Sequence, residues 1–233
     1  MFVRIKRLFA FGVCVLLLAA PLLAAKAEGT GEPTPITDAA GLLAIADNPH
    51  GSYVLAADID MAGVDWLPIP FSGTLDGAGH TIYNLRISRV SEDTSVTYDG
   101  RSRGYHTVYA SLFSYVYAAT ISNLTLLNVQ IDASTDQPAF AAGIAGAIED
   151  ATITNCSVSG RIRLSGLSRQ CGVGGIAGFG SGLIENCRVD AELTVISMNP
   201  DVETEQFLGG VLANGYADLD GCSVVLSGYA SVH

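Results

Sequence analysis

Short runs of alternating apolar and polar residues make up most of the chain from about residue 36 onward. In the segment "TITNCSVSGRIRL", Ile153, Val158 and Ile162 are separated by polar or small residues. This alternation indicates half-buried β-strands, and the Gly, Ser and Asn residues between the runs indicate turns. The pattern therefore predicts an all-β protein built from many short strands.

One early segment follows a helical pattern instead, and it predicts a short helix near residues 38–47. Leu42 and Ile45 supply an apolar face, and Thr37 or Asp38 can accept a hydrogen bond from the first free amides of the helix. The first turn of a stacked β-structure leaves strand edges and core exposed. We therefore expect this helix to cap the first turn.

A phrase recurs along the chain, and its second half reads "TIYNLRI", "TISNLTL", "TITNCSV", "LIENCRV" and "DLDGCSV". The aliphatic residues at the second position of these segments are separated by 39, 32, 31 and 35 residues. Self-similarity with such a period predicts a solenoid, a propeller or an array, and units this short favour stacked coils over four-stranded blades. We expect a right-handed parallel β-helix of about five coils, with equivalent strands about 4.8 Å apart.

Equivalent residues of successive coils are then expected to lie above one another. An asparagine ladder would mark one corner, a file ending in cysteines would lie next to it, and an aliphatic column would fill the core. The ladder comprises Asn84, Asn123, Asn155 and Asn186; the file comprises Leu85, Leu124, Cys156, Cys187 and Cys222; the column comprises Ile82, Ile121, Ile153, Ile184 and Leu219. The Cα spacing allows disulfides between coils, but parallel stacking gives unfavourable dihedrals, so free buried thiols are favoured over disulfides.

The segment "YVLAADIDMAGVDWLPIPFSGTLDGAGHTIYNLRIS", residues 53–88, is followed by the repeated "GIAG" of residues 143–146 and 175–178. Together these resemble proteins with the GLUG motif and the non-catalytic β-helical region of the immunoglobulin A1-specific protease family. The resemblance covers roughly residues 36–230 and implies a surface or secreted β-helix, often one module of a larger adhesin-like protein. It does not carry over protease activity, because the chain has no zinc-binding HExxH motif.

The N-terminus predicts export. Three basic residues precede an apolar run that ends in the small-x-small pattern "AKA", so residues 1–27 resemble a cleaved signal peptide. An uncleaved anchor is the alternative, although the run is short for a bilayer span. Residues 28–35 would form a linker and residues 36–233 a single β-helix domain with its capping helix. We expect the protein to be secreted or held at the cell surface.

Charge and composition exclude several classes of partner. The formal net charge is −11, and no basic stripe is present, so nucleic acid is not an expected ligand. No further apolar segment is long enough for a bilayer, so we do not expect an integral membrane protein. The cysteines form no CxxC pair, and Asp58 and Asp60 are expected to cap turns rather than bind calcium. We expect no metal, no cofactor and no catalytic residue, because no acid–base cluster is recognisable.

The polar insertion of residues 89–109 is the candidate ligand site, because loops on a rigid scaffold commonly carry recognition. Aromatic faces stack on sugar rings, and arginines bind carboxylates. The candidate residues are Tyr98, Arg101, Arg103, Tyr105 and His106. The expected ligand is an extracellular glycan or protein.

Three functions fit this sequence. The first is a non-enzymatic, adhesin-like β-helix that binds carbohydrate or host matrix; the alternatives are a β-helical polysaccharide lyase or glycoside hydrolase and an architectural spacer. The last strand pattern, "SVVLSGYASVH", has no capping device. The C-terminal coil is therefore a candidate for end-to-end self-association.

Overall fold

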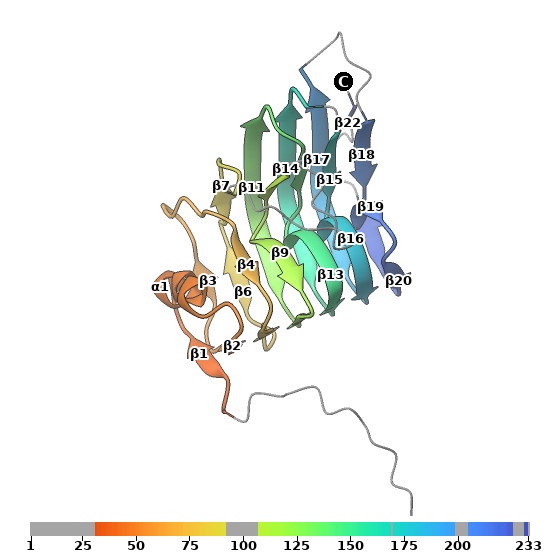
Figure 1. Cartoon of the computed structure of the whole chain (residues 1–233). Coiled ribbons are helices and arrows are strands. Elements are labelled where there is room, and N and C mark those ends of the chain that lie inside the picture. The colour runs from red at the N-terminus through yellow and green to blue at the C-terminus, as the bar shows by residue number, and fades with distance from the viewer. Residues whose placement is uncertain (1–30, 92–106, 169, 199–204, 226–230, 233) are drawn as a thin grey trace, which may run out of the picture. The chain divides into compact units, whose positions relative to one another are not determined.

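The computed structural model describes residues 31–91, 107–168, 170–198, 205–225 and 231–232. In these ranges the strands form three sheets, and the strand pairs are parallel. Figure 1 shows the strands of successive turns side by side, with α1 and β1 at one end and β20 at the other. The prediction of an all-β parallel solenoid with one short helix near its start is confirmed.

Residues 107–135, 139–166 and 170–197 make about three full turns of the solenoid. Each of these turns contributes strands to all three sheets, and shorter strands before and after them extend the sheets. The predicted count of about five coils is not confirmed.

The strands are grouped here by sheet. The ten-stranded sheet contains β1 (Thr34–Ile36), β2 (Ser52–Leu55), β4 (Ile69–Phe71), β5 (Thr74–Asp76), β9 (Phe113–Tyr117), β10 (Thr120–Ser122), β13 (Ala145–Thr154), β16 (Ala177–Glu185), β19 (Leu212–Gly215) and β20 (Asp218–Asp220). The eight-stranded sheet contains β3 (Ile59–Asp60), β6 (Thr81–Tyr83), β7 (Arg86–Ile87), β11 (Thr125–Thr135), β14 (Ser157–Gly166), β17 (Arg188–Ser197), β21 (Ser223–Val225) and β22 (Ser231–Val232). The four-stranded sheet contains β8 (Val108–Ala110), β12 (Ala139–Ala141), β15 (Gln170–Gly174) and β18 (Glu205–Gly209).

The predicted helix is present as α1 (Ala39–Leu43) followed by the 3₁₀ helix η1 (Ala44–Asp47). The Asp38 side chain accepts a hydrogen bond from the Gly41 amide at 2.8 Å, which satisfies a free N–H at the start of α1. Leu42 and Ile45 are fully buried and join the core. β1 begins before the helix, within residues that the sequence assigned to a linker.

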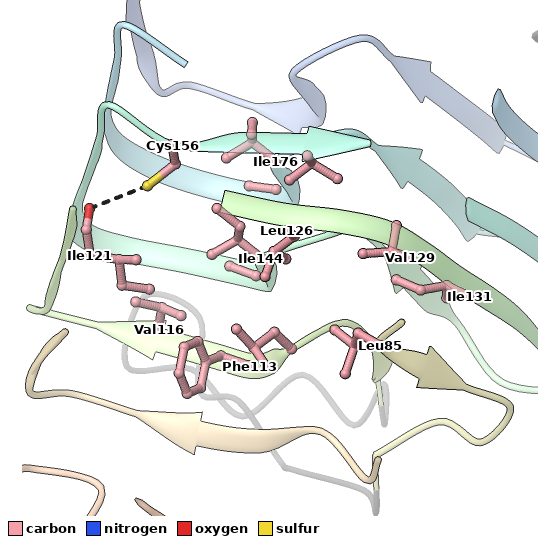
Figure 2. Close-up of a cluster of buried hydrophobic side chains, with 14 of the residues drawn as sticks. Leu85, Phe113, Val116, Ile121, Leu126, Val129, Ile131, Ile144, Cys156 and Ile176 are labelled. Atoms are coloured by element: carbon pink, nitrogen blue, oxygen red, sulfur yellow. Dashed lines mark hydrogen bonds between the residues drawn. The ribbon is translucent and has the colours of Figure 1, made fainter. Parts of the chain in front are cut away.

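The central column of the core follows the repeat. Ile121 pairs with Ile153, Ile153 pairs with Ile184, and Ile184 pairs with Leu219. Ile121 lies in the buried cluster with Val116 and Ile144 (Figure 2). Ile153 and Ile184 belong to the same cluster, whereas Leu219 is about half exposed. Residues at equivalent positions of the repeated segment therefore pair with one another in successive turns.

Residues 53–88, called the leader from here on, enter this column in a different register from the one expected. Leu75, not Ile82, pairs with Ile121, while Ile82 pairs with Leu126 in the eight-stranded sheet. The cause is the tight turn of residues 77–80, which contains Ala78 and Gly79 at positive φ and separates β5 from β6. The prediction that Ile82 lies in the Ile121 column is wrong.

The closing glycines of the "GIAG" phrase make room for aromatic rings. A Cβ at Gly146 would lie 2.4 Å from the Cβ of Tyr109, and one at Gly178 would lie 2.7 Å from the Cβ of Phe140. Tyr109 and Phe140 pair in adjacent strands and form a small buried cluster beside the main core, where burial raises the pKa of Tyr109. The phrase repeats glycine there because backbone and ring approach closely.

Candidate ligand-binding site

The predicted loop residues Tyr98, Arg101, Arg103, Tyr105 and His106 lie in residues 92–106, outside the described part of the chain. Their role stays a prediction. The described residues contain a different candidate, a polar groove on the outward side of the eight-stranded sheet.

A β-bulge lies within this groove. The pairing of β11 with β14 shifts between Leu126 and Val129, where Asn128 has a φ of 57° and is the extra residue. Gly160 lies opposite with a φ of 131°, and a Cβ there would be 2.3 Å from the Val129 carbonyl oxygen. Glycine is therefore required at this position, and both Asn128 and Gly160 line the groove.

The groove has a volume of about 500 Å³, and its lining comes from four neighbouring strands and the segments beside them. Arg86, Gln130, Arg161 and Glu192 pair in register across β7, β11, β14 and β17 and form a polar file along it. The remaining lining residues are Ile87, Ser88, Asn128, Val129, Ile131, Asp132 and Gly160. Most of the polar members are exposed.

The charges of the groove are unevenly paired. The Arg161 guanidinium Nε lies 3.1 Å from Glu192 Oε2, so these two charges largely satisfy each other. Asp65 bridges to Arg86 only through the backbone, and its carboxylate binds Arg89 at 3.1 Å and Ser88 at 3.1 Å. Within the part of the chain that the structure describes, the Arg86 guanidinium has no carboxylate within ion-pair distance. Arg86 is thus an exposed cation at one end of a polar groove.

An apolar surface adjoins the polar file. Tyr83 and Leu127 pair across β6 and β11 just before the bulge, and 51% of Leu127 is exposed. A polar file of amide, guanidinium and carboxylate groups next to an apolar pair can hydrogen-bond hydroxyl and carboxylate groups while covering an apolar ring face. This arrangement suits an extended polar ligand such as a glycan chain.

The asparagines of the predicted ladder lie in two files. Asn155 Nδ2 donates to Asn123 Oδ1 at 3.3 Å, and Asn123 Nδ2 donates to Asp76 Oδ1 at 2.9 Å. Asn84 lies elsewhere, because its Nδ2 donates to Asp60 Oδ1 at 2.9 Å and its Oδ1 accepts from Asn128 at 2.7 Å.

All four predicted ladder residues share a left-handed backbone. The φ values are 58° at Asn84, 54° at Asn123, 54° at Asn155 and 53° at Asn186. Asparagine is one of the few non-glycine residues that tolerates this conformation. The side chains therefore serve the corners of the solenoid, and Asn186 occupies the matching corner one turn beyond Asn155.

In the leader, Asp60 accepts a hydrogen bond from the amide two residues later and so caps a local turn, whereas Asp58 bonds to the start of the adjacent strand β6. The Thr81 amide and the His80 side chain donate to Asp58 and lower the pKa of its carboxyl. Asn84 and the Ala62 amide do the same for Asp60. In the described ranges, no group of three or more His, Cys, Asp or Glu side chains is placed to hold a metal ion.

The four cysteines of the described chain are free. Cys156 and Cys187 are buried and Cys222 is half-buried in three successive turns. Cys171 lies apart from them, in β15, close to Gly166, where a Cβ would be 2.3 Å from its sulfur. Burial raises the pKa of the Cys171 thiol.

The groove was missed by sequence reasoning, although a signal exists. In "TLLNVQID" two adjacent leucines and an asparagine break the alternation at Leu127 and Asn128, which is how a bulge appears in a strand pattern. Its glycine partner, Gly160, lies more than thirty residues later, so only the strand register brings the two together.

This solenoid is similar to several known proteins. An immunoglobulin A1 protease of Streptococcus sanguinis is 28% identical in an alignment that covers 84% of this chain and 12% of the protease. The predicted resemblance to immunoglobulin A1 proteases is confirmed. Halomucin of Haloquadratum walsbyi is 32% identical over 162 residues, which cover 60% of this chain and 2% of halomucin. No protein-family model matches the chain.

A crystal structure of a candidate immunoglobulin A1 protease from Bacteroides ovatus has a TM-score of 0.51 with this structure. It is 18% identical and is matched over 86% of this chain and 77% of its own, so the two share a fold. The chain spans only a small fraction of either curated relative. Within the described residues, no helix has the length and apolar composition needed to cross a bilayer.

Proposed function

We propose that the chain is an exported, non-enzymatic β-solenoid module, adhesin-like in function, that contacts a glycan through the groove of the eight-stranded sheet. The observation that carries this proposal is the Arg86 guanidinium, which has no carboxylate partner among the described residues and lies in one polar file with Gln130 and Arg161, in a groove of about 500 Å³. The sheet fixes the backbones of these residues, and their exposed side chains lose rotamer freedom when a ligand binds.

Two further observations support the proposal. The relatives are much larger proteins, of which this solenoid resembles a small part, as expected for a module that positions or binds rather than reacts. The chain has no HExxH motif, so the chemistry of zinc proteases has no counterpart in this sequence.

The proposed secretion or attachment to the cell surface is supported by the signal-like pattern of residues 1–27.

We infer that the glycan is acidic from Arg86, because the other charges that line the groove are Arg161, Glu192 and Asp132. A guanidinium without a carboxylate partner binds a uronate or sulfate through charge-assisted hydrogen bonds. The neighbouring Gln130 and Asn128 amides can bind hydroxyl groups, and Leu127 with Tyr83 can cover the face of a sugar ring. The predicted loop residues Tyr98 and Tyr105 would add contacts from the insertion.

The experiment is retention of the purified chain on a panel of acidic and neutral glycans, with analysis of the bound glycans for cleavage products. We expect retention on an acidic glycan without cleavage. Arg86→Ala should weaken retention by about tenfold or more, because a charge-assisted hydrogen bond contributes about 1.5–3 kcal/mol.

The matched control is Arg188→Ala. Arg188 is an exposed arginine of the same sheet that lies outside the groove, and its guanidinium is 3.9 Å from Asp190. This change should alter retention less than about twofold. Equal losses in the two variants, or none in either, would remove the groove from the site.

The same assay separates the other functions. Cleavage products would support a polysaccharide lyase or hydrolase, and an absence of retention on any glycan would support an architectural spacer. Alanine at both Tyr98 and Tyr105 tests the insertion, and unchanged retention would exclude it from the site.

End-to-end self-association at the last turn is a separate part of the proposal. Leu219 and Val224 are 51% and 41% exposed on β20 and β21, and exposed apolar strands favour association. Sedimentation equilibrium would give a dimer if this turn pairs with a second copy and a monomer if it does not.

A further inference from the structure

The three cysteines that follow the solenoid corners form a vertical file. The Arg188 amide donates to the Cys156 carbonyl at 2.9 Å, and the Ser223 amide donates to the Cys187 carbonyl at 2.9 Å. These bonds repeat from one turn to the next, so Cys156, Cys187 and Cys222 lie one above another at the separation of paired strands, about 4.8 Å.

Each thiol of the file points at backbone carbonyls. Figure 2 shows the Cys156 thiol directed at the Ile121 carbonyl. Cys187 Sγ lies 3.6 Å from the Ile153 oxygen and 3.3 Å from the Glu185 oxygen.

Cys222 repeats this arrangement one turn later. Its sulfur lies 3.4 Å from the Ile184 oxygen and 3.4 Å from the Asp220 oxygen. The sulfurs of Cys187 and Cys222 thus lie beside the negative ends of carbonyl dipoles, which disfavour a bare thiolate, so a thiolate at either position needs a bound cation as its counter-charge.

The stacking does not suit a disulfide. Side chains related by a simple translation keep their Cβ atoms about 4.8 Å apart, whereas a disulfide needs roughly 3.5–4.5 Å between Cβ atoms and about 2 Å between sulfurs. The same stacking suits a metal bridge. Two metal–thiolate bonds of about 2.3 Å in line span about 4.6 Å, close to the separation of the turns.

We propose that Cys187 and Cys222 form a two-coordinate site for a soft, linear cation of the mercuric or cuprous class. With a mercuric ion, both thiols lose their protons and two sulfur–metal bonds form, so one ion binds, two protons leave and no oxidant is needed. The resulting bis-thiolate is neutral, which lowers the cost of burying it. Soft thiolates select such cations over calcium, magnesium or manganese.

The solvent exposure of the three cysteines indicates which pair binds the cation. Cys156 and Cys187 are both 1% exposed, whereas Cys222 is half-buried and gives an entry path at the last turn. Cys171 belongs to the four-stranded sheet and has no cysteine paired with it, because its neighbours in register are Ala139 and Gln206. The site is independent of the proposed glycan groove.

The experiment loads the reduced full chain with one equivalent of mercuric chloride and titrates it with β-mercaptoethanol. A chelate of two stacked thiols should resist the monothiol, so release should need about 100-fold more competitor than a single cysteine adduct does. Cys222→Ser should lose this resistance, and the matched control Cys171→Ser should keep it. Circular dichroism of each variant confirms that it is folded.

A second measurement serves if Cys222→Ser does not fold. In the Cys171→Ser chain, binding of the tightly held ion should release two protons, as followed with a pH indicator. Release of the ion at the same competitor concentration from Cys171→Ser and Cys222→Ser would overturn the proposal. So would release of a single proton, or a Cys187–Cys222 disulfide found by mass spectrometry in the untreated chain.

Discussion

The repeat turns and the leader build the same solenoid by different means. In the repeat turns, β14 and β17 pair without a shift through ten consecutive residues, from Ser157 with Arg188 to Gly166 with Ser197. The repeat turns also contain shifts, between β11 and β14 and between β13 and β16, but their paired runs are long. In the leader the paired runs are short: β3 pairs with β6 through two residues, and β4 pairs with β9 at Ile69 and Phe71. Register in the repeat turns therefore comes from the repeat itself, and register in the leader must come from elsewhere.

Large side chains anchor the leader. Trp66 is fully buried, and its Nε1 donates to the Leu112 carbonyl of the first full turn at 2.7 Å. Phe71 stacks on Phe113 with ring centroids 4.6 Å apart. The core of the repeat turns instead consists mainly of Val, Ile, Leu, Ala and Cys, many of them in matching files. The comparison indicates that a solenoid can be held by repetition or by a few specific aromatic contacts.

The largest expected effect is at the centre of the repeat turns. Ile153→Ala removes buried methyl groups that pack against Ile121 below and Ile184 above, so it should cost about 2–5 kcal/mol in the free energy of unfolding. Urea denaturation measures this cost. Thr152→Ala, on the neighbouring half-buried position, should cost under about 1 kcal/mol, and equal losses at the two positions would contradict the central column.

The aromatic anchor gives the next effect and tests the leader alone. Trp66→Phe keeps a ring in the core but leaves the Leu112 carbonyl without its donor, which costs about 1–3 kcal/mol. Hydrogen exchange should become faster in residues 52–87 and stay slow in residues 145–197. Uniform acceleration through both ranges would show that the two regions do not differ in the way proposed.

The close approach of neighbouring backbones in the repeat turns can be tested at Gly178. A Cβ there would lie 2.6 Å from the Gly146 carbonyl oxygen, so Gly178→Ala should cost about 1–3 kcal/mol through overpacking. Gly31→Ala is the control, because a Cβ at Gly31 has no atom within 4 Å. Thermal unfolding of both variants measures the difference, and an unchanged melting temperature for Gly178→Ala would refute the packing described.

The smallest effect is expected at a corner. Asn155 has a φ of 54°, so Asn155→Ala should cost about 1–2 kcal/mol in backbone strain and lost hydrogen bonding. Asn155→Gly keeps the conformation accessible and should recover most of that loss. If both variants unfold at the same denaturant concentration, the side-chain bond to Asn123 rather than the backbone determines the residue.

Much of the fold could be predicted from the sequence, because a repeated phrase implies repeated geometry. Ile121, Ile153 and Ile184 share a column as their spacing predicts. The leader could not be aligned in this way, since "TIYNLRI" looks like "TISNLTL" but belongs to a different sheet. An extra turn at residues 77–80 has no counterpart in the later phrases, and only its tertiary pairing reveals it.

The candidate site was less predictable than the fold. Its groove depends on Asn128 and Gly160, which become neighbours only when two turns stack in the shifted register. Arg86 lacks an ion-pair partner among the described residues because the Asp65 carboxylate binds Arg89 and Ser88 instead. The spacing of these residues in the sequence does not predict which of them Asp65 binds. Sequence pattern predicts which strands exist, and side-chain competition decides what their outer face can bind.

A crystal structure of the chain tests the central claim most directly, through the Cα separations of Ile121, Ile153 and Ile184. In-register stacking predicts consecutive separations of about 4.8 Å, with the three side chains pointing into one core. Separations well beyond the distance between paired strands, or side chains on different elements, would contradict the solenoid and remove both the groove and the cysteine file.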